Sequence, residues 1–200
     1  MSTASRITRL PRAFEADRGA DACAAVPALT GDLARLVDGA AGSAPYLHGL
    51  VLRESEWLPA ALEAPEQAVK DELARILALP FDKIDDGLRQ AKRRIALIAA
   101  LCDLGGIWAL HEVTGALTDL ADAATHVALR AHIAREITPG KVPGQGEDDI
   151  ETCGGVVALA MGKHGAGELN YSSDIDLICL FDETRFDGSD QMEARAADKP

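Results

Sequence analysis

Two aspartates near the end of the sequence, Asp174 and Asp176, have the spacing of a metal-binding pair. Residues i and i+2 of a β-strand point to the same side, so both carboxylates meet at one place if the segment is extended. Adjacent carboxylates repel each other unless a cation lies between them, and Mg²⁺ prefers such oxygen ligands. The pair predicts a magnesium site in which both aspartates are metal ligands and catalytic residues. A D-x-D pair taken alone is equally compatible with two chance aspartates at a solvated strand end.

A glycine turn precedes this pair and contains the residue types that bind phosphate groups. Gly162 and Gly165 allow the backbone to approach a phosphate closely, and Lys163 between them is positively charged. Ser172 and Ser173 can donate hydroxyl hydrogen bonds to phosphate oxygens beside the metal. These five residues are therefore predicted to bind a nucleotide or its phosphates.

The order of these features is more specific than any one of them. It runs from a strand through a glycine turn, a short helix and the serines to an acidic strand. Transfer of a nucleotidyl group requires positioning of a phosphoryl centre between two oxygens, together with neutralisation of its charge. The segment Gly162 to Phe181 is therefore interpreted as the metal- and phosphate-binding half of a nucleotidyltransferase site.

Other polar residues are weaker candidates. In the glycine turn, His164 is expected to be exposed, and Glu168 is expected to support the short connecting helix. Three histidines and a glutamate without metal-ligand spacing are expected on helix surfaces: His111, Glu112, His126 and His132. A basic cluster is also expected on a solvated helix face: Arg89, Lys92, Arg93 and Arg94.

The residues before the glycine turn are predicted to be mostly helical. Apolar residues at alternating spacings of three and four follow one helix face from Ile84 to Cys102 and a second from Val113 to Ala131. Shorter helices are expected at Leu29–Val37, Tyr46–Arg53 and Glu66–Leu79. Several amphipathic helices in a row must pack on one another, so this portion is predicted to form a small helical bundle.

The segment before the glycine turn differs in composition from the helical region, because it contains prolines, glycines and an acidic run. We divide the chain into a loosely ordered leader (1–26), a helical region (27–137), a linker (138–155) and the start of a nucleotidyltransferase domain (156–200). The fold class is therefore α+β, with a helical region followed by the first half of a mixed-sheet α/β domain.

Two strands are expected in this last domain. One is Val156–Met161, and the other is Asp174–Asp182, which should have one buried face. Such sites usually have a third carboxylate on a later strand, and no convincing third strand precedes Pro200. The domain is therefore expected to be incomplete.

Composition limits the class of protein. The formal net charge of −12 over 200 residues disfavours nonspecific nucleic-acid binding, which depends on neutralising phosphates. The four cysteines are far apart and lack zinc spacing, which favours reduced thiols. No secretory signal or membrane-spanning apolar run is apparent, so we expect a cytoplasmic protein with no membrane partner.

The run from Ala160 to Ile178 resembles the glutamine synthetase adenylyltransferase family nearly residue for residue. The E-L-N-Y-S-S element, Glu168–Ser173, distinguishes this family from most nucleotidyltransferases, whose glycine-to-acid connection is shorter. The likeness extends upstream to about Pro45.

The resemblance implies a function. The family is bifunctional, with two tandem nucleotidyltransferase domains, and by position this site corresponds to the first, which removes AMP. The implied reaction is phosphorolysis, in which inorganic phosphate releases ADP from an adenylylated tyrosine of glutamine synthetase. Mg²⁺ at Asp174 and Asp176 is the implied cofactor, with ATP or ADP and phosphate as substrates or products, and Gly162 and Ser173 as the nearest phosphate contacts.

The implied partners are glutamine synthetase and, in the full-length family, a nitrogen-signalling regulatory protein. Because family members are several times longer, the chain is expected to be an N-terminal part that is inactive or nearly so by itself. Two alternatives stay open: a related nucleotidyltransferase such as a uridylyltransferase, and a truncated, inactive module that binds a nucleotide or a partner.

Overall fold

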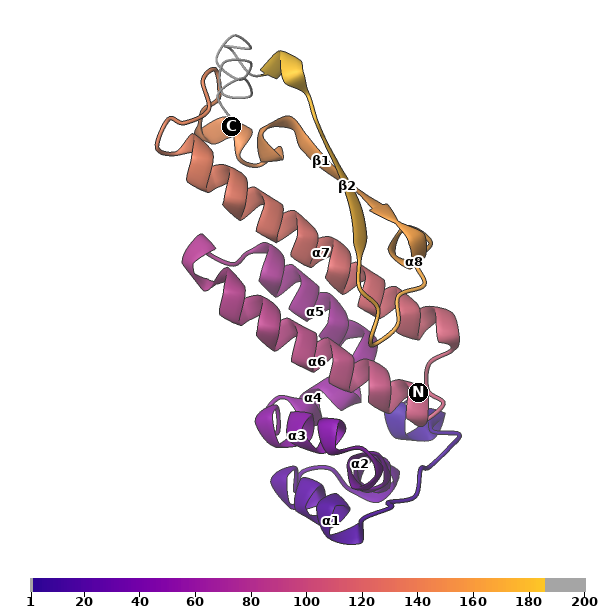
Figure 1. The fold of residues 1–200 in the computed structure, drawn as a ribbon. Coiled ribbons are helices and arrows are strands. Elements are labelled where there is room, and N and C mark those ends of the chain that lie inside the picture. The colour runs from indigo at the N-terminus through magenta and orange to yellow at the C-terminus, as the bar shows by residue number, and fades with distance from the viewer. Residues whose placement is uncertain (1, 186–200) are drawn as a thin grey trace, which may run out of the picture.

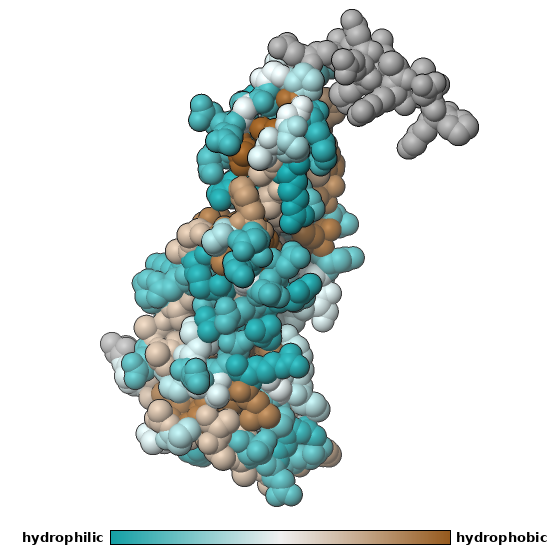
Figure 2. Space-filling view, turned by 90° about the vertical axis from the view of Figure 1, so that its left-hand side faces the viewer, coloured by the Kyte–Doolittle hydropathy of each residue, from teal (hydrophilic) through white to brown (hydrophobic). Residues whose placement is uncertain are grey.

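Three helices lying side by side support the rest of the molecule, as the computed structural model of residues 2–185 shows (Figure 1). They are α5 (Pro65–Leu77), α6 (Ile84–Leu104) and α7 (Leu110–Ile137), and each packs against the other two. Four shorter helices gather at one end of this layer: α1 (Ala16–Ala25), α2 (Gly31–Ser43), α3 (Pro45–Arg53) and α4 (Leu58–Glu63). The molecule is elongated, and hydrophilic side chains cover much of the face in Figure 2.

Strands β1 (Val156–Met161) and β2 (Asp176–Phe181) form an antiparallel hairpin beside α7, with the short helix α8 (Gly162–Gly165) between them (Figure 1). Single 3₁₀ turns complete the described elements at Thr3–Arg6, Phe81–Lys83, Glu147–Asp149, Cys153–Gly155 and Glu183–Arg185. The α+β fold class is confirmed. None of the described helices is both long and apolar enough to cross a membrane.

The predicted apolar stripes pack into the core, although Leu88, Leu117 and Leu120 are only partly buried. The stripe on α6 includes Ile95 and Ile98, which are fully buried in the main core together with Leu36 of α2 and Leu58 of α4. Further along, Val127 of α7 packs in a smaller cluster with Ile84. Helix α7 begins where the Glu112 carboxylate accepts a hydrogen bond from the Ala109 backbone N–H at 2.7 Å, which satisfies a donor left free at a helix start.

The expectation of a loosely ordered leader is wrong for its second half. Helix α1 forms there and packs against α2 and α3. Its contact surface is made of small residues: Ala22 is fully buried, and a Cβ on Gly19 would lie 2.4 Å from the Asp38 carboxylate. Close approach of two helices through small side chains leaves no large apolar period in the sequence.

The basic cluster on α6 is not simply a solvated face. The nearly buried carboxylate of Glu54 accepts hydrogen bonds from Arg93 Nε at 2.8 Å and Arg94 Nε at 2.9 Å. Arg94 also donates to Glu72 at 2.6 Å, and Glu72 accepts a further bond from Arg75 at 2.7 Å. These arginines compensate two buried acids, while Arg89 and Lys92 of the same cluster remain exposed.

The hairpin differs from the expected strand pair in its burial. In β1, alternate residues are partly buried toward α7, but every residue of β2 is exposed, so the expected buried face of the second strand is absent. Within residues 2–185 the sheet contains only these two antiparallel strands, and β2 has no neighbour on its other edge. A two-stranded ribbon lacks the second layer that would bury it.

The predicted linker is a loop with two 3₁₀ turns, and polar contacts organise it. The Gln145 side-chain amide donates to the Gly154 carbonyl at 2.9 Å. Asp149 accepts a short hydrogen bond from Arg185, a residue that follows β2. Asp149 therefore ties the loop before β1 to the turn that follows β2.

Candidate functional site

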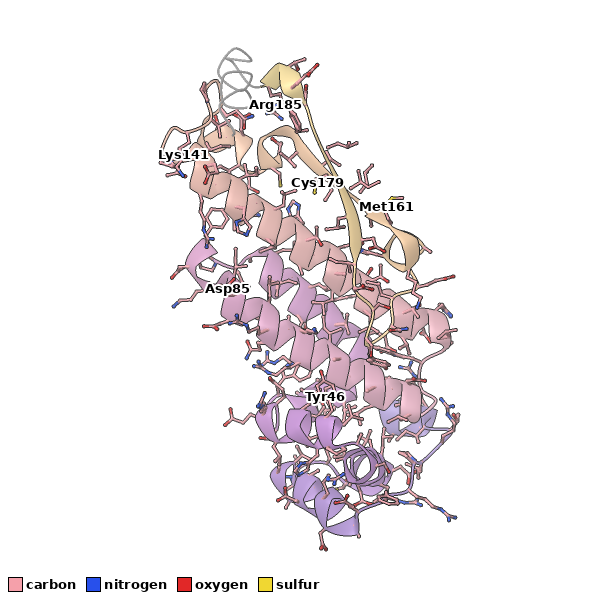
Figure 3. All side chains as sticks on the ribbon, viewed as in Figure 1. Tyr46, Asp85, Lys141, Met161, Cys179 and Arg185 are labelled. Carbon is pink, nitrogen blue, oxygen red and sulfur yellow. The ribbon has the colours of Figure 1, made fainter. Side chains whose placement is uncertain are left out.

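The hairpin register brings the glycine turn to the acidic strand. Met161, the last residue of β1, pairs with Asp176, the first residue of β2 (Met161 is labelled in Figure 3). Gly162 follows with a φ of +55°, in the left-handed region that favours glycine, and a Cβ there would lie 3.4 Å from Asp176 Oδ2. The Gly162 backbone and the Asp176 carboxylate are therefore neighbours.

Gly165 is needed for a different reason. A Cβ at this position would lie 2.4 Å from the Ala160 carbonyl oxygen in β1, too close for any side chain. The turn is further closed by a hydrogen bond from the Glu168 N–H to the Lys163 carbonyl at 2.8 Å. The short helix thus lies at Gly162–Gly165 itself, and Glu168, expected to support a helix after the turn, lies outside it.

The two serines lie in a turn organised by Asn170, a residue that the sequence reasoning did not single out. The Asn170 side-chain oxygen accepts hydrogen bonds from the Ser172 N–H and the Ser173 hydroxyl, each at 3.0 Å. In return, Ser173 Oγ accepts from the Asn170 N–H at 3.1 Å. An Asn two residues before a serine is the sequence signal of such a turn.

Asp174 and Asp176 are both exposed, and Asp174 lies just before β2 rather than within it. Within the part of the chain that the structure describes, no group of three or more His, Cys, Asp or Glu side chains is arranged to hold a metal ion. Two carboxylates still suit Mg²⁺, which is usually held by one or two carboxylates together with substrate phosphates and water. The donor chemistry of the pair fits this ion.

His164 is buried, so the expectation that it is exposed is wrong. It is 4% exposed, and its Nε2 lies 2.7 Å from Asp122 Oδ1 on helix α7. Because a carboxylate only accepts, Nε2 carries the hydrogen of this bond, while Nδ1 is buried without a hydrogen-bond partner within residues 2–185. The histidine ties the glycine turn to the helical layer. The partners are 42 positions apart in the sequence, which explains why the sequence gives no sign of this contact.

The other predicted residues are placed as follows. Lys163 is exposed beside Gly162, and its charge is available to a ligand at the turn. Tyr171 is 44% exposed, and the partial burial of its side chain, together with the Asp103 carboxylate, raises the pKa of its hydroxyl above the usual range. The structure thus brings Gly162 and Asp176 together, and the Asn170 turn orders the serines that precede Asp174 in the sequence.

Comparison with known proteins gives one consistent result. The profile of the family described as glutamate-ammonia ligase adenylyltransferase matches residues 29–197. Three relatives share the description "Bifunctional glutamine synthetase adenylyltransferase/adenylyl-removing enzyme": that of Rhodopseudomonas palustris is 41% identical over 82% of this chain, that of Bradyrhizobium sp. 43% over 72%, and that of Caulobacter vibrioides 38% over 85%.

The chain spans about a sixth of the length of these relatives, since the matched segments cover 17%, 15% and 18% of them. No solved structure shows significant similarity to it.

Proposed function

Because this chain belongs to the glutamate-ammonia ligase adenylyltransferase family, we propose that it is the adenylyl-removing part of such an enzyme. Its substrate is glutamine synthetase that carries AMP on a tyrosine, and inorganic phosphate is the second substrate. The observation that carries the proposal is the juxtaposition of the Gly162 backbone with the Asp176 carboxylate at the end of the hairpin where β1 leads into α8.

The proposed reaction is a phosphoryl-centre displacement. An oxygen of inorganic phosphate forms a bond to the phosphorus of AMP, and the bond from that phosphorus to the tyrosine oxygen breaks. ADP is released, and the tyrosine oxygen takes up a proton. Mg²⁺ held by Asp174 and Asp176 supplies the neutralisation of charge on the phosphoryl oxygens.

The protein side chains position the reactants. Gly162 has a left-handed backbone conformation and no Cβ, so a phosphate group can approach the end of β1 close to the Asp176 carboxylate. Lys163 contributes positive charge, and the turn around Asn170 fixes Ser173 next to Asp174. Positioning and charge neutralisation are the main requirements of phosphoryl transfer.

The test is Mg²⁺-dependent release of ADP from adenylylated glutamine synthetase by the longer enzyme that contains this chain. Asp174→Asn and Asp176→Asn should each lower kcat by at least about 100-fold, since each removes a charged metal ligand. Asp148→Asn, at an exposed aspartate outside the site, is the matched control and should leave kcat unchanged. Full ADP release by both site variants would refute the assignment.

We further propose that the 200-residue chain alone is inactive or nearly so, since two carboxylates are an incomplete set for this fold. Robust ADP release by the purified chain would contradict this. The proposal also makes glutamine synthetase the partner, includes a nitrogen-signalling regulatory protein as a partner of the longer enzyme, and places the protein in the cytoplasm, where its four free cysteines stay reduced.

A further inference from the structure

A cavity of about 650 Å³ lies between helices α6 and α7 and the connection from α8 to β2. Its volume is within the range of small-molecule sites in proteins, roughly 300–1,000 Å³. In Figure 1 the connection runs down from α8 toward α6 before it returns as β2. Ser172 and Ser173 line the cavity while Gly162, Asp174 and Asp176 do not, and the proposed reaction assigns no role to the lining residues on α6 and α7.

One rim of the cavity is cationic. Arg89 and Lys92 are three residues apart on α6, so they lie on the same face of the helix, and both line the cavity. Arg89 makes only a long, exposed contact of 3.4 Å with Asp86. Lys92 is exposed and has no hydrogen-bond or ion-pair partner among residues 2–185. Two largely uncompensated cations on a protein with a net charge of −12 mark a place for an anion.

The opposite rim is formed by the serines. Ser172 and Ser173 line the same cavity as Arg89 and Lys92, across from α6. Both serines are predicted from the sequence as phosphate contacts, and Asp174 follows Ser173 directly in the chain. This rim of the cavity therefore belongs to the segment that leads directly into the first predicted metal ligand.

The interior of the cavity is apolar and aromatic. Leu88, Leu117 and Leu120 form its walls, and the side chains of Tyr46 and Tyr171 also line it. Tyr46, labelled on α3 in Figure 3, is 60% exposed although its ring borders this cavity. Flat aromatic rings beside apolar walls suit a planar heterocycle. An inorganic anion would make no use of this surface.

We propose that this cavity is an adenine-nucleotide subsite, in which the purine lies against the apolar wall and the phosphate lies between Arg89, Lys92 and Ser172. The inference rests on the proposed function for the choice of adenine, and it adds that binding of the nucleotide here does not require metal. The two cations and the Ser172 hydroxyl hold the phosphate at this lip, whereas Asp174 and Asp176 act only with Mg²⁺.

The experiment is calorimetric titration of the 200-residue chain with AMP in EDTA. We expect a Kd below about 1 mM. Arg89→Gln and Lys92→Gln should each weaken AMP binding by at least about fivefold, as loss of a charge-assisted hydrogen bond does. Arg35→Gln is the matched control, because Arg35 is similarly exposed (69% against 71% for Arg89) and similarly paired three residues away, to Asp32. The Arg35→Gln variant should bind AMP with the same affinity as the unchanged chain.

Two further titrations test which ligand binds and whether it binds in this cavity. Inorganic phosphate alone should bind more weakly than AMP, because it leaves the apolar wall unused. Ala124→Leu, which puts a larger side chain into the cavity, should weaken AMP binding while circular dichroism shows the helices intact. No AMP binding in EDTA would overturn the proposal. Equal losses in the Arg35, Arg89 and Lys92 variants would do the same.

The failure of this inference can be told apart from failure of the proposed function. Asp174→Asn with Asp176→Asn should abolish ADP release by the longer enzyme and leave metal-free AMP affinity of the chain unchanged. If AMP does not bind the chain but ADP release still depends on the two aspartates, the cavity is excluded and the reaction stands. If AMP binds and ADP release is indifferent to the aspartates, the reaction is refuted and the cavity stands.

Discussion

Replacing Gly165 with alanine should destabilise the protein through one backbone collision. The new Cβ would lie 2.4 Å from the Ala160 carbonyl oxygen, and because Cβ atoms do not approach other atoms within 3.0 Å, α8 and β1 must separate by about 0.6 Å. The backbone fixes the position of the Cβ, and its partner is a main-chain oxygen, so no side-chain rotation relieves the contact. Overpacking of this kind costs roughly 1–3 kcal/mol. The lower chain entropy of alanine in the unfolded state offsets about 0.5 kcal/mol of it.

The assay is urea denaturation of the 200-residue chain followed by circular dichroism. We expect Gly165→Ala to lower the free energy of unfolding by about 1–2 kcal/mol. Gly115→Ala is the control, because Gly115 is inside α7 and a Cβ there would meet nothing within 4 Å. It should raise the free energy of unfolding by about 0.5–1 kcal/mol, as helix propensity requires. If both variants are stabilised, the tight packing of the glycine turn against β1 is refuted.

Two further predictions concern the helical layer. Arg94→Leu removes a shared partner of Glu54 and Glu72, so each buried carboxylate keeps only part of its compensating charge. In urea denaturation the free energy of unfolding should fall by about 2–4 kcal/mol. A loss below about 1 kcal/mol would contradict the buried network. The hydrogen bond from Arg6 lowers the pKa of Glu66 from 4.5 to about 2, so the stability that this ionised carboxylate contributes is complete above pH 4.5 and disappears as the pH falls toward 2. Because Glu66 is 45% exposed, solvent screening reduces the contribution to about 1 kcal/mol, and Glu66→Gln should remove that part of the dependence of the urea midpoint on pH; an unchanged dependence would show that the pair contributes nothing.

Large apolar residues made the long helices predictable. The stripe that starts at Ile84 predicts α6 to within two residues of its end, because each of its members needs burial and only a helix brings them to one face. The same reasoning missed α1, whose packing depends on Gly19 and Ala22. Alanine and glycine occur throughout this sequence, so their positions carry little periodic signal.

The candidate site was predictable where its chemistry is local. The pairing of the glycine turn with the acidic strand follows from residues that lie within one hairpin, and β1 matches its predicted bounds. The burial of His164 could not be predicted, because its partner Asp122 belongs to another element. The exposure of β2 was also missed, since the alternation of Ile and Leu in a strand does not reveal whether a second layer covers it.

The bond between His164 and Asp122 has a consequence for dissecting the protein. The glycine- and proline-rich segment at 138–155 suggests a place to cut, yet the turn that carries Gly162 is anchored to α7 on the far side of that segment. A fragment that starts at 156 loses this anchor and leaves the His164 ring without its one hydrogen-bond partner among the described residues. The loop at 138–155 separates the helices from the hairpin in the sequence, but the unit that folds together includes residues on both sides of it.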